Sequence, residues 1–426
     1  MVQYEVINKT EGAMNMFEKK LQQYVNLIIK KGLNIQKGDN IFITADVKCQ
    51  DFVQQVTNAA YLAGARLVHA DYSDEVVERY KGLYATDEIF DIFPEYRKTL
   101  IDEQVKISSK RLVIASPNPQ GMAGVDSSKL MRLQKAAYEP MQTYRALQLG
   151  NHMNWCIAAV PNPIWANIVF PDVEDNDAAV ELLWEVILKC THVEDGPDAC
   201  ANWDNHVKSL HNNVKMMNDA NFKTLHYTNS LGTDLYVGLP KGHVWSGGGD
   251  VNVDTKESFA PNIPTEEVFT APDANNINGI VYSSMPLLYQ GQTIENFYFK
   301  FVDGVVVEAF AEKGNEMLQA ILDSDAGARR LGEVALVPFT SPISQSGLIF
   351  NMTLFDENAA CHFALGEAYD NTLPASIGKT PEEQLAIGFN TSMVHVDFMM
   401  GTADLSIVGI TATGEKIPVF IDGCFA

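Results

Sequence analysis

Four separated segments of the chain carry carboxylate, imidazole and phenol side chains in spacings that suit metal-ion binding. The stretch DENAACHFALGEAY, residues 356–369, places His362 and Tyr369 seven residues apart. Its alanines, with Asp356 and Glu357 at the start, predict a helix, because acidic residues stabilise the first helical turn. Seven steps of about 100° return to the same helix face. We therefore expect the imidazole and the phenol to point the same way.

A second pair lies in MVHVDFMMG, residues 393–401, where polar and apolar residues alternate. Alternation predicts a strand that presents His395 and Asp397 on one face and the apolar side chains on the other. An imidazole nitrogen and a carboxylate oxygen at this spacing suit one metal ion. A hydrogen-bonded His–Asp pair, or a histidine satisfied within a core, fits the same spacing, so both interpretations stay open at this point.

Two further carboxylate segments lie earlier in the chain. NIPTEEVFTAP, residues 262–272, has Glu266 and Glu267 at the start of a predicted extended segment. Neighbours in a strand point to opposite faces, so one glutamate can face a metal ion while the other faces substrate or solvent. Adjacent glutamates are also common as plain surface charge. In RRLGEVALVPF, residues 329–339, Glu333 leads into an apolar run that predicts a buried strand.

Composition limits the classes of function. The chain has 426 residues, 46% of them hydrophobic, which is typical of a globular protein with two or three domains. Its net charge of −23 argues against binding to nucleic acid or anionic lipid, because phosphate groups require clustered Lys and Arg. The acidic surface is expected to aid solubility. A second hypothesis is that it attracts cationic substrates such as peptide α-amines.

The cysteines and the apolar runs together predict the cellular compartment of the protein. The six cysteines are scattered without CxxC pairs, which predicts reduced thiols rather than a disulfide framework. Residues 1–17 lack a basic region followed by an apolar core, so no signal peptide is predicted. No apolar run approaches the ~18–20 residues that a membrane span needs. The sequence predicts a soluble, cytoplasmic protein without membrane contact.

The elements that position these residues fall into two regions. Residues 1–200 alternate short apolar strands with helices, which predicts an α/β domain built on a parallel sheet. Strands are expected at 40–46, 66–72, 111–117 and 155–161, and helices at 17–31, 51–64, 75–83, 96–108, 127–148, 177–189 and 198–218. No G-x-G-x-x-G follows a strand and no G-x-x-x-x-G-K-[ST] occurs, so a nucleotide site is not expected.

Residues 201–426 are predicted to form an α+β, β-rich catalytic domain that binds metal, with the boundary near 195–222. Alternating runs separated by Gly, Asn and Asp replace helical periodicity there. Asp303-Gly304 predicts a hairpin turn. Helices are expected at 315–322, 357–369 and 381–389. The run Gly247-Gly248-Gly249 lacks a phosphate-binding context and is expected to be a flexible loop.

The chain resembles the thermophilic-type metallo-aminopeptidases, the group of aminopeptidase S, aminopeptidase T and PepS. The resemblance lies, in order, in IPTEEVFTAP, LGEVALV, GLIFNMTLFDENAACHFALGEAY (347–369) and HVDFMMG (395–401), with support from NSLGTDLYVGL (229–239). It is strong in the second half and general in the first. After TAP the chain has DANNING, where a basic residue is expected in many relatives. This departure affects expected substrate preference and leaves the metal site untouched.

The resemblance implies a cofactor of two divalent metal ions, Zn, Co, Mn or Mg. By position, the six ligands fall on Glu267, Glu333, His362, Tyr369, His395 and Asp397. Three carboxylates, two imidazoles and a phenol form a mixed set of hard and borderline ligands that suits these metals. Glu267 or Glu333 is expected to bridge the two ions, which in two-metal hydrolases lie roughly 3.5–4 Å apart.

The implied reaction is hydrolysis of the N-terminal peptide bond of short peptides by activated solvent. Glu266 is the expected general base, and Tyr369 is expected to help hold the charge of the oxyanion. The resemblance also suggests a homodimer that encloses the site. Two alternatives remain: another two-metal amidohydrolase such as a deacylase, and a non-catalytic ligand-binding protein. Neither a G-x-S-x-G elbow nor an H-E-x-x-H helix occurs, which disfavours a serine hydrolase and a thermolysin-like zinc site.

Overall fold

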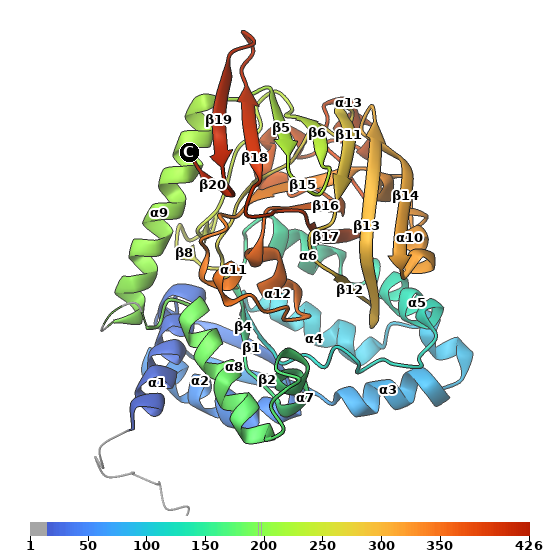
Figure 1. Ribbon diagram of the computed structural model, residues 1–426. Coiled ribbons are helices and arrows are strands. Elements are labelled where there is room, and N and C mark those ends of the chain that lie inside the picture. The colour runs from blue at the N-terminus through green and yellow to red at the C-terminus, as the bar shows by residue number, and fades with distance from the viewer. Residues whose placement is uncertain (1–14, 195, 197) are drawn as a thin grey trace, which may run out of the picture.

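The computed structural model describes residues 15–194, 196 and 198–426. It has an α/β region built mainly from the first half of the chain and a β-rich region built from the second half (Figure 1). Residues 1–14, within the segment for which the sequence predicts no signal peptide, lie outside the described residues. Within the described ranges, every helix is too short or too polar to cross a membrane.

A parallel sheet forms the centre of the α/β region. Among the described residues it has five strands in the order β2-β1-β3-β4-β9. Their bounds are β1 (Asn40–Asp46), β2 (Leu67–Ser73), β3 (Lys110–Ala115), β4 (Trp155–Ala159) and β9 (Asn262–Ile263). The first four confirm the predicted strands, and their apolar side chains fill a shared core. The fifth strand comes from the second half of the chain and pairs with β4 at Ile157 and Ala158.

Helices cover this sheet at positions close to the predicted ones. They are α1 (Met16–Leu27), α2 (Gln50–Leu62), α3 (Glu75–Tyr84), α4 (Glu95–Lys106), α5 (Ser127–Tyr138), α6 (Gln142–Leu149), α7 (Pro163–Val169), α8 (Asn176–Cys190) and α9 (Ala199–Ala220). The side chains of Asp74, Asp126, Asp175 and Asp198 accept backbone N–H groups and so begin helices. The single helix predicted at 127–148 is two helices, because Pro140 lacks an N–H group and interrupts the ladder.

A large antiparallel sheet dominates the β-rich region. In the described part of the chain it has nine strands, in the order β12-β13-β11-β6-β5-β18-β19-β20, with β14 paired to β13. The strands are β5 (Thr224–Thr228), β6 (Asp234–Gly238), β11 (Ile277–Tyr282), β12 (Leu287–Tyr289), β13 (Gln292–Val302), β14 (Val305–Lys313), β18 (Ser406–Ile410), β19 (Lys416–Ile421) and β20 (Cys424–Phe425). Asp303 and Gly304 both have positive φ between β13 and β14, which confirms the predicted hairpin turn.

A small antiparallel sheet packs against the large one. Its strands, in spatial order, are β10 (Val268–Thr270), β15 (Leu331–Leu336), β16 (His362–Gly366) and β17 (His395–Met399). Val334, Phe363 and Phe398 are in register across three of these strands and form its apolar face. The ring of Phe398 lies 4.9 Å from that of Phe299 in the large sheet. This packing leaves the opposite face of the small sheet free for polar side chains.

The remaining elements are short connections around the two antiparallel sheets. They are the two-stranded pair β7 (Asp250–Val251) and β8 (Ser258–Phe259), and the helices α10 (Asn315–Leu322), α11 (Pro342–Ser346), α12 (Thr353–Asp356) and α13 (Pro381–Ala386). Phe350 and Phe355, which flank the start of α12, pack in the core of the α/β region. The indole N–H of Trp165 donates to the carbonyl oxygen of Phe350 at 2.7 Å. The two regions therefore share core residues, and the division of the chain at residue 200 stays a prediction.

The helix predicted over residues 356–369 is wrong. Helix α12 ends at Asp356, a single 3₁₀ turn covers Glu357–Ala359, and His362–Gly366 is a strand. This strand is buried and paired on both sides, by β15 and by β17. Cross-strand hydrogen bonds and burial outweigh the intrinsic helix preference of Ala, Leu and Glu. The helical geometry argued for His362 and Tyr369 therefore does not apply.

Candidate metal centre

The polar face of the small antiparallel sheet gathers side chains from separate strands. Glu333, Ala364 and Asp397 lie opposite one another across β15, β16 and β17, and Gly366 lies opposite His395. Directly opposed residues share one face of a sheet. Alternation adds His362, which is two residues before Ala364. The central strand thus carries small residues between larger polar ones, which leaves space in the middle of the face.

The charged atoms of this face approach one another closely. Nε2 of His362 lies 3.3 Å from Oε2 of Glu267 and 3.6 Å from Oε1 of Glu333. Nε2 of His395 lies 3.7 Å from Oε2 of Glu333 and 3.3 Å from Oδ1 of Asp397. Ligand atoms of Glu267, Glu333 and His362 all lie within 4.8 Å of one another. The structure therefore brings together the ligands expected from four separate segments.

Both histidines are fixed in orientation by the backbone. Nδ1 of His362 lies 3.1 Å from the carbonyl oxygen of Ala360, and Nδ1 of His395 lies 2.7 Å from that of Glu367. A carbonyl oxygen only accepts, so each Nδ1 carries a proton and donates it. Each Nε2 then faces the carboxylates. Histidines that bind metals are oriented in this way, because the hydrogen bond at one ring nitrogen sets the other as the ligand.

The electrostatics of the pair His395 and Asp397 are strongly altered. Burial would lower the pKa of His395, but the charge of Asp397 and its hydrogen bond outweigh burial and raise that pKa to about 10. Burial would raise the pKa of Asp397, but the charge of His395 and its hydrogen bond hold it below the usual value. Without a cation, the pair is therefore an imidazolium and a carboxylate at neutral pH.

Two other members of the cluster, Glu333 and Tyr369, resist ionisation. Burial raises the pKa of Glu333, and the charges of Glu267 and Asp397 add to the effect. The pKa of Tyr369 is raised well above 10 by burial and by the charge of Glu333. The ring of Tyr369 lies 5.0 Å from that of His395 and 6.1 Å from that of Phe269. Tyr369 therefore lies beside the cluster with a protonated phenol, although it is reached by a loop after β16 and not by a helix.

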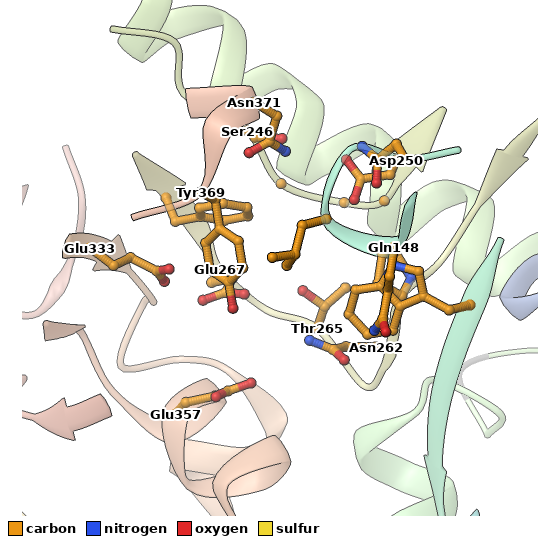
Figure 2. A pocket seen from close by; sticks show the side chains of 18 of the residues that line it. Gln148, Ser246, Asp250, Asn262, Thr265, Glu267, Glu333, Glu357, Tyr369 and Asn371 are labelled. Carbon is orange, nitrogen blue, oxygen red and sulfur yellow. The ribbon is translucent and has the colours of Figure 1, made fainter. Parts of the chain in front are cut away.

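Glu357 is a site residue that the sequence analysis missed. It lines the same cavity as Glu267, Glu333 and Asp397, and Figure 2 shows its carboxylate on the same side of the cavity as Glu267. Burial and the charges of Asp397 and Glu267 raise its pKa well above 4.5. The sequence placed it in the first turn of a helix, where a carboxylate needs no other explanation. The only sequence feature that pointed to a role for Glu357 was its place in the run that also contains His362.

Glu266 points away from the cluster, as alternation with Glu267 predicts. Its Oε1 lies 2.8 Å from Nε2 of His192, and its backbone N–H donates to Oδ1 of Asn358 at 2.6 Å. The preceding carbonyl oxygen, of Thr265, accepts from Nε2 of His206 at 2.7 Å. Glu266 is not among the described residues that line the cavity. This placement does not favour the general-base role expected from the sequence, because its carboxylate faces His192, just after α8, and His206 of α9 instead.

A cavity opens between the two regions at this cluster. The space between its side chains, including the open mouth, is about 800 Å³. Figure 2 shows Glu267, Glu333, Glu357 and Tyr369 toward one side, and Gln148, Asn262 and Asp250 toward the other. The lining also includes Leu149, Asn151, Trp155, Ser246, Gly247, Gly248, Gly249, Pro261, Thr265, Phe269, Asn371, His395 and Asp397. The lining therefore mixes apolar and polar side chains, with carboxylates at both ends.

The glycine run that was expected to be a flexible loop is packed against the site. Gly247, Gly248 and Gly249 all have positive φ. A Cβ on Gly247 would lie 2.4 Å from the carbonyl oxygen of Glu267, and one on Gly249 would lie 2.8 Å from that of Phe259. Only glycine permits both this backbone conformation and this close approach. The run fixes the position of Asp250 relative to the strand that begins after Glu267.

These residues fit a divalent metal site. Oε2 of Glu267 is buried and has no hydrogen-bond partner in the part of the chain that the structure describes. Four carboxylates face only two imidazoles across the cluster, so negative charge would be in excess with all four carboxylates ionised. A partly buried excess of this kind is costly unless cations balance it. Oxygen and imidazole donors without thiolates suit Zn²⁺, Mn²⁺, Co²⁺ or Mg²⁺.

Comparison with known proteins finds a family and relatives that match nearly the whole chain. The family described as thermophilic metalloprotease (M29) matches residues 17–425. The chain is 40% identical over 414 residues to aminopeptidase AmpS of Bacillus subtilis (strain 168), covering 97% of this chain and 100% of that protein. It is 41% identical over 413 residues to aminopeptidase 2 of Geobacillus stearothermophilus, covering 97% and 99%. The structure of wild-type AmpT from Thermus thermophilus matches with a TM-score of 0.89 at 36% identity, over 96% of this chain and 100% of that chain.

Proposed function

The chain belongs to the thermophilic metalloprotease (M29) family, and from this premise we propose that it hydrolyses the N-terminal peptide bond of short peptides with two divalent metal ions as cofactors. Relatives that match along nearly the whole chain are named aminopeptidases, so this chain is a metal-dependent aminopeptidase. The observation that supports two ions is the group of four carboxylates and two imidazole Nε2 atoms beside the cavity.

The proposed ligands are the six expected from the sequence together with Glu357. They are Glu267, Glu333, Glu357, His362, Tyr369, His395 and Asp397. Binding of cations favours the ionised carboxylates, and fully ionised they would carry four negative charges, which equals the charge of two divalent cations. A single divalent ion would leave two of these charges unbalanced in a partly buried site. Charge balance therefore supports a pair of ions.

Glu333 is placed so that it would help hold both ions. One of its oxygens lies 3.6 Å from Nε2 of His362, and the other lies 3.7 Å from Nε2 of His395. A carboxylate with one oxygen toward each histidine is suited to serve two ions at once. Glu267 lies beside His362 at 3.3 Å, which favours a role at one ion.

Divalent ions bound in such a site would polarise a carbonyl group and lower the pKa of a bound water toward about 7. The chain itself supplies orientation and charge control. In the metal-free cluster Tyr369 retains its proton because its pKa is raised. A phenol that kept this proton beside the ions would donate it in a hydrogen bond to the carbonyl oxygen as negative charge develops there. The backbone carbonyls of Ala360 and Glu367 hold the two imidazoles in place.

Glu266 is proposed as a positioning residue. It precedes Glu267 directly, and its carboxylate and backbone N–H are held by His192 and Asn358. These contacts fix the peptide unit that aims Glu267 at the cluster. The general-base role expected for Glu266 from the sequence stays a prediction.

A homodimer in the cytoplasm is proposed from the resemblance. Exposed apolar side chains on α3 support association, namely Val76, Val77, Tyr80 and Tyr84. Contiguous apolar patches on a surface mark contacts with other proteins. Light scattering after size-exclusion chromatography is expected to give twice the chain mass of 47.1 kDa. A mass of one chain at micromolar concentration would contradict the dimer.

The function is tested with blocked and unblocked substrates. The purified protein is expected to cleave Leu-p-nitroanilide and to ignore N-acetyl-Leu-p-nitroanilide, because the reaction needs a free α-amine. A chelator is expected to abolish cleavage, and added divalent metal is expected to restore it. Elemental analysis is expected to find two metal ions for each chain. Cleavage of the acetylated substrate at a similar rate would instead support the deacylase alternative.

A further inference from the structure

The cavity has a second acidic end, separate from the metal cluster. Asp250, in β7, lines it on the side away from Glu333 and Glu267 (Figure 2). The glycine run 247–249 holds this strand against the segment that carries Glu267, so the distance between the two acidic ends is fixed by the backbone. A rigid separation between two charged groups is a basis for selecting a ligand by length.

Asp250 has amide side chains as its hydrogen-bond partners. The side chains of Asn151 and Asn371 hydrogen-bond to its carboxylate, and burial raises its pKa above the usual value. It forms no ion pair within the described residues, and no Lys or Arg of those residues lines the cavity. Burial destabilises the ionised form of such a carboxylate, and no ion pair among the described residues offsets this cost. A cation supplied by a ligand would remove that cost.

Asn371 supplies a second unmatched acceptor beside Asp250. Its Oδ1 is buried and has no hydrogen-bond partner among the residues that the structure describes. Asn371 also lines the cavity. A buried acceptor without a donor is unfavourable, and here it lies near a carboxylate that also only accepts. A group with several N–H donors and a positive charge, an ammonium or a guanidinium, satisfies both.

The walls between the two ends suit an aliphatic stem. Leu149, Trp155 and Phe269 line the cavity together with Pro261. Lysine and arginine side chains bury their methylene groups against apolar surface while the charged head meets a polar partner. The α-amine and scissile bond belong at the metal cluster, so a side chain that extends from there along these walls runs toward Asp250.

We propose that Asp250 is a specificity-determining residue that binds the cationic side chain of an N-terminal lysine or arginine. This proposal rests on the aminopeptidase function proposed above. It identifies peptides that begin with a basic residue as preferred substrates. The competing assignment, in which Asp250 binds the α-ammonium group common to all peptides, predicts a different result in the test.

The test compares Lys-p-nitroanilide with norleucine-p-nitroanilide, which differ by the terminal ammonium group. The metal-loaded wild-type protein is expected to prefer lysine in kcat/KM by at least about tenfold, the usual effect of one charged hydrogen bond. Asp250→Asn is expected to bring this ratio close to one, and Asp250→Glu is expected to keep a preference for lysine. Asp254→Asn is the matched control, because Asp254 is exposed and paired with His152 outside the cavity.

A second readout uses free amino acids as competitive inhibitors of Leu-p-nitroanilide cleavage. Lysine is expected to inhibit the wild-type protein more strongly than norleucine does, and Asp250→Asn is expected to remove the difference. An unchanged lysine preference in Asp250→Asn would overturn the proposal. If Asp250→Asn lowered kcat/KM equally for the lysine and norleucine substrates, the proposal would also be overturned, and Asp250 would be assigned to the α-ammonium group. If wild-type protein cleaved neither substrate, the aminopeptidase function itself would fail, and that outcome is distinct from cleavage without preference.

Discussion

Nε2 of His192 lies 2.8 Å from Oε1 of Glu266, so a histidine after α8 holds the carboxylate next to a proposed metal ligand. If Glu266 positions the backbone, Glu266→Gln is expected to keep this contact through its amide oxygen. The variant should then retain its metal and lose less than about tenfold in kcat, because one neutral hydrogen bond replaces a charged one. Elemental analysis and steady-state kinetics measure both quantities. A loss of more than about 100-fold with full metal content would restore the general-base role that the sequence predicts.

Removing the carboxylate of Glu333 is expected to remove the cofactor. Glu333→Gln eliminates the charge that lies between His362 and His395, so metal content should fall below two ions for each chain. Losing a metal ligand should lower activity more than losing a residue that only supports a ligand. We therefore expect kcat/KM to fall by at least about 100-fold. Glu295→Gln, at an exposed ion pair with Lys313, serves as the control. A fully active Glu333→Gln variant that retains both ions would refute the ligand assignment.

Metal affinity is expected to rise with pH. In the metal-free protein the pKa of His395 is raised to about 10, so its Nε2 is protonated at neutral pH. A metal ion binds only the unprotonated nitrogen, so binding must release this proton. Because the raised pKa lies above neutrality, each unit of pH lost below about 10 lowers the apparent affinity about tenfold for this proton. Chelator competition at pH 6, 7 and 8 measures the slope, and an affinity independent of pH in this range would contradict the expectation.

The small residues of the central strand are expected to be necessary for the site. Ala364 lies between Glu333 and Asp397 on the polar face. Ala364→Leu adds volume there, so it should block metal binding and cost about 1–3 kcal/mol of stability through overpacking. The control is Leu365→Met on the apolar face, which conserves volume and is expected to cost less than about 1.5 kcal/mol. Metal content and urea unfolding distinguish the two, and metal binding unchanged in Ala364→Leu would show that the face is not the site.

Much of the fold could be predicted from local patterns. The run NIFITAD is a strand at 40–46, because β-branched apolar residues in a short run suit a buried parallel strand. The alternation in HVDFM likewise predicted β17 and the shared face of His395 and Asp397. In both cases the deciding signal lies within the segment itself.

The segment around His362 could not be predicted in this way. Its alanines and leucine have helix propensity, but the strand forms because β15 and β17 pair with it on both sides. Those partners lie about thirty residues away in each direction, outside any local pattern. The same error hid Glu357, since its approach to the cluster depends on the chain turning sharply before the strand. The opposite directions of Glu266 and Glu267 were predictable from alternation, whereas the contact with His192 was not.

The two-residue strand β9 links the architecture of the protein to its cofactor. Ile263 is anchored beside Ala158 in the parallel sheet, and only four positions later Glu267 reaches the opposite region. Any swing of one half against the other would pull that oxygen away from the imidazole it faces. Metal ions bound there would therefore restrain the two regions, so the width of the cavity would depend on whether the ions are bound. Without the ions this restraint at the cavity would be lost, while the core that the two regions share around Phe350 and Phe355 would still join them.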